Sequence, residues 1–169
     1  MSTVVDQLIQ KVEAILAQIK SRTIDALKPY TVRKPKPDQL FSCLELFYIQ
    51  GCTLSYNSFF ARRAEGVLET EYEAFEGNQE SFLPELREFI EQLRSEVELN
   101  EKEGVELFER YEHQLQTFFS DCWKEAGGER SLIPTFFAFE KEYRCRDLIS
   151  GEVMEEHEAA ARLGFVPKP

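Results

Sequence analysis

Apolar side chains recur at intervals of three and four residues along most of this chain, and this spacing constrains the fold more than any other feature. The first such stripe consists of Val5, Leu8, Val12, Ile15 and Ile19. In an α-helix, residues at this spacing lie on one side, which then packs against another element. We therefore predict an amphipathic helix over residues 1–27, with Ser2 or Thr3 as its N-cap.

A segment rich in proline and basic residues follows this helix. Residues 28–38 contain three prolines and four Lys or Arg. Proline ends or kinks a helix and moves the preceding residue out of the helical region. We expect Pro29 to end the helix and residues 28–38 to form an extended linker, so that residues 1–27 are an N-terminal arm.

The apolar spacing continues through the rest of the chain, where single glycines separate the stripes. Helices are expected at about residues 38–50, 56–75, 81–97, 105–123, 131–150 and 152–163. One run, Leu44–Ile49, is short and apolar enough to be a strand instead. We prefer a helix there because Glu45 and Leu46 are weak strand formers. The predicted fold is all-α: one domain over residues 1–169, in which a bundle of six or seven helices over residues 39–169 follows the arm and linker.

The amino-acid composition limits the class of protein and the cellular compartment that we expect. The chain has 169 residues, a length typical of one domain, and its 14 Phe, 6 Tyr and 1 Trp argue against global disorder. No apolar run approaches the roughly 20 residues of a membrane-spanning helix. The first segment is too charged to be a signal peptide, so we expect a cytoplasmic protein with reduced cysteines. These cysteines are Cys43, Cys52, Cys122 and Cys145.

The net charge of −11 is distributed unevenly. Residues 65–112 contain sixteen Glu and four Lys or Arg, a net charge of −12. This excess of acid argues against nucleic acid or an anionic membrane as the partner. It could instead attract a basic partner, or serve only to keep the protein soluble.

Motifs for catalysis or metal binding are absent from the sequence. Arg110 and Met154 precede the two histidines, His113 and His157, by three residues, where a dinuclear metal bundle requires Glu. The cysteines lack zinc-site spacing, and there is no nucleophile elbow, phosphate loop or dinucleotide turn. We therefore expect no catalytic residues, no metal and no cofactor.

Residues 43–63 are the most hydrophobic and least charged stretch, and they give one candidate binding site. The candidate residues are Glu45, Tyr48, Tyr56, Arg62 and Arg63, accompanied by the aromatic Phe59 and Phe60. A buried carboxylate requires a partner or a proton, and the two arginines could pair with Glu45. The alternative is a structural ion pair within an ordinary aromatic core.

The arm and linker give a second candidate site, for a protein partner. Its residues are Val5, Leu8, Val12, Ile15 and Ile19 on the arm and Arg33, Lys34 and Lys36 in the linker. The basic linker could also dock on the acidic residues 65–112 of the same chain or of a second copy.

Three functions remain open at this point. We favour a non-catalytic interaction or regulatory protein, an adaptor or assembly factor that acts through the arm and the acidic helices by self-association or by binding a protein partner. The first alternative is a helical bundle that binds a small apolar or tetrapyrrole-like molecule at residues 43–63. The weaker alternative is an enzyme whose site is assembled across helices.

Overall fold

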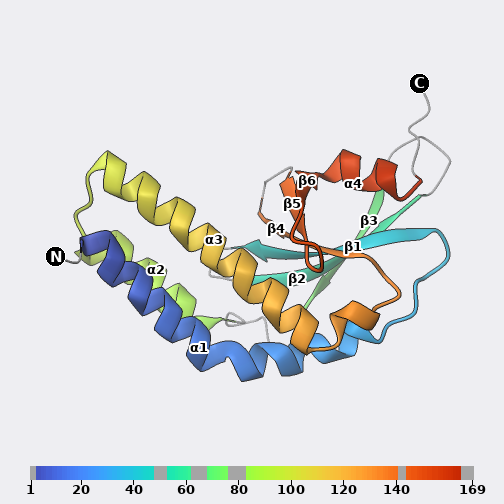
Figure 1. The fold of residues 1–169 in the computed structure, drawn as a ribbon, viewed down its shortest axis with the longest axis horizontal. Coiled ribbons are helices and arrows are strands. Elements are labelled where there is room, and N and C mark those ends of the chain that lie inside the picture. The colour runs from blue at the N-terminus through green and yellow to red at the C-terminus, as the bar shows by residue number, and fades with distance from the viewer. Residues whose placement is uncertain (1–2, 48–52, 62–67, 76–82, 141–143, 165–169) are drawn as a thin grey trace.

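The computed structural model describes residues 3–47, 53–61, 68–75, 83–140 and 144–164. Within them the chain forms four α-helices, one short 3-10 helix and a six-stranded mixed sheet (Figure 1). The fold is therefore α+β, and the prediction of an all-α helical bundle is wrong.

The sheet has the strand order β3-β2-β1-β4-β5-β6. Its strands are β1 (Gln39–Phe47), β2 (Thr53–Phe60), β3 (Glu69–Ala74), β4 (Thr135–Phe139), β5 (Arg144–Asp147) and β6 (Val153–Glu155). The central strands β1 and β4 are parallel, and every other neighbouring pair is antiparallel. The parallel pair joins two segments that are far apart in the sequence.

The helices are α1 (Val4–Thr31), α2 (Pro84–Glu96), α3 (Glu101–Glu125) and α4 (Glu156–Arg162), and the 3-10 helix is η2 (Gly128–Arg130). Long apolar stripes predicted α1, α2 and α3, and all three are confirmed. α1 and α3 run side by side in the same direction, and their N-terminal halves project beyond the sheet (Figure 1). No helix among the described segments is both apolar and long enough to cross a membrane.

Local capping explains where two of these helices begin. The Thr3 hydroxyl accepts a hydrogen bond from the Asp6 backbone N–H, while the Asp6 carboxylate accepts one from the Thr3 N–H. Asn100 and Glu103 make the same reciprocal pair at the start of α3. Each pair satisfies N–H groups that the helix itself leaves without a partner. At the other end of α1, the helix continues through Pro29 to Thr31, so the expected stop at Pro29 is wrong.

The first error in the predicted secondary structure concerns residues 38–50. Residues 39–47 form β1, and residues 48–50 lie outside the described residues. Between Phe41 and Leu46 every residue except Glu45 is buried, because β1 lies in the middle of a sheet that is covered on both faces. A short run that is buried on both faces has no period of two, and it cannot be distinguished from a buried helix by pattern.

The second error concerns residues 56–75, which form β2 and β3 where they are described. In β2 the large side chains of Leu54 and Tyr56 alternate with the small polar side chains of Ser55 and Asn57. β3 alternates in the same way, with glutamates at every second position. This period of two is typical of strands, and the aromatic residues at helical intervals obscured it.

The third error concerns residues 131–150, which contain β4 and β5 instead of a helix. All five residues of β4 are buried, again because the strand is central and covered on both faces. Phe137 stacks on Phe119 of α3 with a ring-centroid distance of 4.8 Å, whereas Phe136 faces the opposite side and contacts Phe41. The aromatic cluster therefore belongs to two faces of a sheet.

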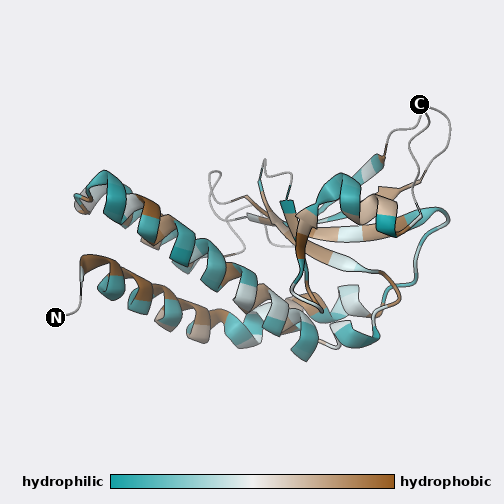
Figure 2. Ribbon diagram, turned by 45° about the horizontal axis from the view of Figure 1, so that its top comes forward, coloured by the Kyte–Doolittle hydropathy of each residue, from teal (hydrophilic) through white to brown (hydrophobic). Residues whose placement is uncertain are grey.

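Two hydrophobic layers cover the two faces of the sheet. The larger layer packs α1, α2 and α3 against one face, and the hydrophobic side of α1 is turned toward α3 (Figure 2). The smaller layer lies between the other face and α4, where Ala159 and Ala160 pack near Phe41 and Cys43. The helices α1 and α4 therefore mark the opposite faces, which decides which side chains can meet.

Candidate functional site

The sheet face beneath α4 has an apolar half and a polar half. α4 covers the apolar half, at the beginning of β1. Toward the end of β1 the same face carries Glu45, and register places Ser55 of β2 and Ala138 of β4 opposite it. Because side chains alternate along a strand, Asn57 lies on this face as well. Three polar side chains therefore gather on two neighbouring strands.

Glu45 is held by a short hydrogen bond. The Asn57 amide nitrogen Nδ2 donates to Glu45 Oε2 over 2.6 Å. Burial raises the pKa of Glu45 above its ordinary value, and the bond from Asn57 opposes this rise. The neighbouring carboxylates Glu140 and Glu156 raise the pKa further. The site therefore concentrates negative charge in a partly dehydrated place.

Two further carboxylates border this position. Glu140 follows β4, and its backbone N–H donates to the carbonyl of Leu46, which places it beside the end of β1. Its side chain is only 6% exposed. Glu156 is the first residue of α4, and burial raises its pKa above the ordinary value. The carboxylates thus come from β1, the end of β4 and the start of α4.

Two oxygen atoms on β2 lie buried without a hydrogen bond. The side chain of Ser55 is fully buried, and its hydroxyl has no partner among the described residues. Asn57 is 5% exposed, and its carbonyl oxygen Oδ1 likewise has no partner there. Buried polar atoms are nearly always satisfied, so these two oxygens distinguish the polar half of the face from an ordinary packed surface.

Two aromatic rings lie at the edge of this polar half. Phe47, the last residue of β1, and Tyr72 of β3 meet edge to face with a centroid distance of 6.1 Å. Register places Tyr72 opposite Asn57, on the same face. Tyr72 is 60% exposed, so this edge of the site is open to solvent.

The pocket predicted within residues 43–63 is not assembled from its two described members. Glu45 and Tyr56 lie on opposite faces of the sheet, because register pairs Tyr56 with Leu44 instead of Glu45. Tyr56 packs in the larger layer against Tyr30 of α1, with a centroid distance of 4.8 Å. Of its accompanying aromatic residues, Phe59 belongs to the layer beneath α4. The remaining candidates, Tyr48, Arg62 and Arg63, lie outside the described residues.

The apolar residues of the predicted arm are part of the core. Val5, Leu8, Val12 and Ile19 are at most 5% exposed, and Ile15 packs against the same layer. Pairs such as Asp6 with Arg110 at 2.9 Å fix α1 along α3. Most of this stripe therefore faces its own domain.

The basic linker contacts the acidic edge strand β3 of the same chain. Arg33 donates two hydrogen bonds to the Glu73 carboxylate, at 2.6 and 2.7 Å, and stacks over the Tyr30 ring at 4.1 Å. Lys36 forms an ion pair with Glu71. Lys34 is exposed. Two of the three predicted basic residues therefore neutralise part of the acidic segment within the molecule.

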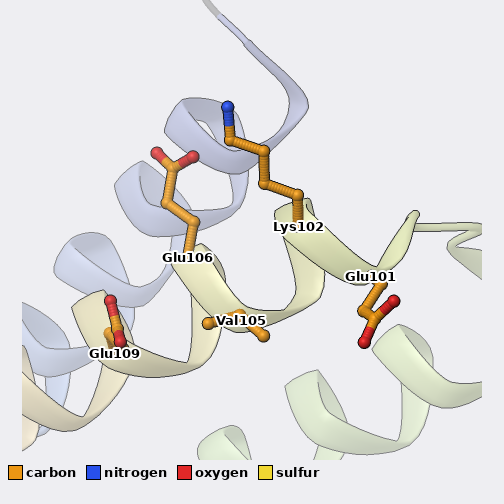
Figure 3. Close-up of a pocket in the computed structure, with 5 residues that line it drawn as sticks. All are labelled: Glu101, Lys102, Val105, Glu106 and Glu109. Atoms are coloured by element: carbon orange, nitrogen blue, oxygen red, sulfur yellow. The ribbon is translucent and has the colours of Figure 1, made fainter.

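The acidic helical surface contains two neighbouring grooves on α3. The first has a volume of about 490 Å³ and is lined by Glu101, Lys102, Val105, Glu106 and Glu109. In Figure 3, Val105 lies between Glu101 on one side and Lys102 and Glu106 on the other. The groove thus has an apolar floor and a charged rim.

The second groove, of about 330 Å³, lies where α3 meets α1. Its lining residues are Ile9, Glu13, Glu109, Arg110, His113 and Gln114. Glu109 lines both grooves, so they are adjacent along the first half of α3.

The three described cysteines are buried. Burial raises the pKa of Cys122 and of Cys145 to about 12 and that of Cys43 well above its ordinary value, so these thiols are protonated and poor nucleophiles. Among the described residues no group of three or more His, Cys, Asp and Glu side chains could hold a metal ion.

Sequence reasoning identified Glu45 but missed its neighbours. Ser55 and Asn57 could have been found from the alternation of small polar and large apolar residues in β2. Glu140 could not, because its position depends on the parallel pairing of β1 with β4. Comparison with protein families, curated proteins and solved structures finds no match to this chain.

Proposed function

We propose that this chain is a non-catalytic cytosolic interaction protein, an adaptor or assembly factor, that binds a basic segment of a protein partner along α3. The observation that carries the proposal is the pair of adjacent grooves in which glutamates, four of the ten lining residues, outnumber the two basic residues Lys102 and Arg110. A segment with Lys or Arg beside one or two apolar side chains would complement both the rim and the floor.

Exposure of apolar side chains supports this choice of surface. Val105 is 55% exposed, and Phe108 and Val4 near the same end of the helices are 43% and 47% exposed. Apolar groups surrounded by charge are typical of docking surfaces, in which burial contributes affinity and charge guides approach. The arm takes part in this surface, because Ile9 and Glu13 of α1 line the second groove beside α3.

The cytosolic assignment rests on the cysteines. Cys43, Cys122 and Cys145 are buried free thiols. Free thiols are typical of a reducing compartment.

Binding of a synthetic amphipathic peptide of Lys and Leu tests the proposal. The double variant Glu106→Gln with Glu109→Gln removes two charges from the groove. We expect it to weaken binding about fivefold to tenfold, since each exposed charge contact contributes up to about 1 kcal/mol. Fluorescence anisotropy at low and physiological salt measures the affinity.

A control variant that removes two charges elsewhere distinguishes binding in the grooves from attraction by the overall electrostatic field of the protein. Glu88→Gln with Glu129→Gln changes two exposed glutamates outside the grooves. This control should bind the peptide like the wild type. Equal weakening in both double variants, or equal binding of an acidic peptide, would refute a specific site on α3.

A further inference from the structure

One row of side chains on α3 alternates between acidic and apolar groups. Glu101, Val105 and Glu109 follow one another at intervals of four residues, and all three line the larger groove. Figure 3 shows Val105 between the two glutamates along the helix. Because an α-helix rises about 1.5 Å per residue, neighbouring members of the row are about 6 Å apart along the axis, and the two glutamates are about 12 Å apart.

The two glutamates of this row are available to a partner. Both are exposed, and neither carboxylate forms an ion pair or a hydrogen bond within the part of the chain that the structure describes. In contrast, the basic Arg110 of the second groove is already paired, with Asp6 at 2.9 Å and with Glu106 at 3.3 Å. The row therefore presents two negative charges on either side of an exposed apolar side chain.

The shape of this surface favours a helix as its occupant. Ile9 and Glu13 of α1 line the second groove together with Glu109, so the row borders the place where the two helices meet. Helices associate by packing ridges of side chains into grooves of this kind. A helical segment also satisfies its own backbone hydrogen bonds, whereas an extended segment needs a strand edge, which the surface of two helices does not offer.

We propose that the segment that docks on α3 is an amphipathic α-helix with two basic residues seven positions apart and large apolar residues between them on the same face. This inference rests on the proposed function and specifies its partner. Seven residues span about 10.5 Å and return to nearly the same side of a helix, so the basic groups reach Glu101 and Glu109 while the apolar groups cover Val105. Lys102, on the rim of the same groove, selects against a further basic residue beside Glu101.

Two synthetic peptides of identical composition and charge test this pattern on the full-length protein. Both are alanine-based and contain two lysines and two leucines. In the matched peptide the lysines are seven positions apart with the leucines between them on one face, and in the mismatched peptide the lysines are five positions apart and face different sides. We expect the matched peptide to bind about fivefold more tightly, because only it can pair with both glutamates. Fluorescence anisotropy measures the affinities, and far-UV circular dichroism measures the helix gained on binding.

Charge reversal in the protein identifies the row. Glu109→Lys should abolish the preference for the matched peptide. A matched peptide in which glutamate replaces one lysine should bind this variant about fivefold more tightly than it binds the wild type. Glu88→Lys, an equal reversal at an exposed position of α2, should leave the preference for the matched peptide unchanged. Thermal unfolding of each variant shows that it remains folded.

The outcomes separate this inference from the docking on which it rests. Equal binding of the two peptides, with both weakened by Glu106→Gln and Glu109→Gln together, would overturn the spacing while docking on α3 stands. Binding of the matched peptide without a gain of helix would overturn the helical partner in the same way. Failure of both peptides to bind would overturn the docking itself, and the helical partner with it.

Discussion

Glu45 illustrates how position in a sheet determines the chemistry of one side chain. It lies in a strand whose neighbours are buried, and among the described residues it is influenced by Asn57 and by the carboxylates of Glu140 and Glu156. Its charge is therefore disfavoured by burial and by repulsion, and the hydrogen bond from Asn57 stabilises it. The ionised form of Glu45 costs stability in the free protein.

This leads to a prediction for Glu45→Gln. Because folding raises the pKa of Glu45, the folded state binds more protons, and this group's contribution to stability is lost as pH rises above the ordinary value of 4.5. Glutamine cannot ionise, and its carbonyl still accepts the bond from Asn57. We expect the variant to be more stable than wild type at pH 7.5 by up to about 1 kcal/mol, and the difference to vanish near pH 4.

Urea denaturation across this pH range measures the difference, with the exposed Glu88→Gln as control. A Glu45→Gln protein that is less stable at pH 7.5 would mean that a group other than Asn57 stabilises the charge of Glu45.

At the scale of elements, the C-terminal end of α3 is fixed by close packing. Gly127 adopts a left-handed conformation, with φ of 102°, immediately after the helix, and η2 follows. The Trp123 indole packs directly over Gly128, and only 1% of Trp123 is exposed. This contact joins the end of α3 to η2 and to the chain that leads into β4.

Two glycine substitutions test that contact. A Cβ atom at Gly128 would overlap the Trp123 ring, so we expect Gly128→Ala to destabilise the fold by about 1–3 kcal/mol. Gly104 lies in the first turns of α3, where an added Cβ would meet open space, and Gly104→Ala should stabilise by up to about 1 kcal/mol. Urea denaturation compares the two. Equal changes in the free energy of unfolding for the two variants would show that both substitutions act only through the entropy of the unfolded chain.

At the scale of the molecule, α1 is an integral part of the domain. Its apolar stripe lies in the same layer as residues of β1, β2 and β4. The Thr31 hydroxyl, at the end of the helix, donates to the carbonyl of Ala126 at 3.0 Å. Ion pairs with α3, including Lys20 with Glu125 at 2.6 Å, lie along its length.

Deletion of residues 1–36 is therefore expected to abolish cooperative folding, because it exposes one face of the sheet and one side of α3 to water. Thermal unfolding followed by circular dichroism measures the loss. Addition of residues 1–36 as a separate peptide should restore a transition. A truncated chain that unfolds cooperatively by itself would contradict this role and would instead support a detachable arm.

The three long helices and the acidic character of their surface could be predicted from the amino-acid sequence. Stripes such as that of Val5, Leu8 and Val12, together with local caps at Thr3 and Asn100, depend on residues within one or two turns. Such signals are readable because a helix makes its hydrogen bonds within its own segment. Glu45 was likewise identifiable as a carboxylate in an apolar run.

That β1 to β6 form one sheet, and which face of it each side chain occupies, followed from tertiary pairing alone. Strands make their hydrogen bonds with distant segments, and central strands are buried on both faces, so β1 and β4 carry no period that marks them. For this reason the sequence placed Glu45 with Tyr56, whereas strand register places it with Ser55, Asn57 and Glu140.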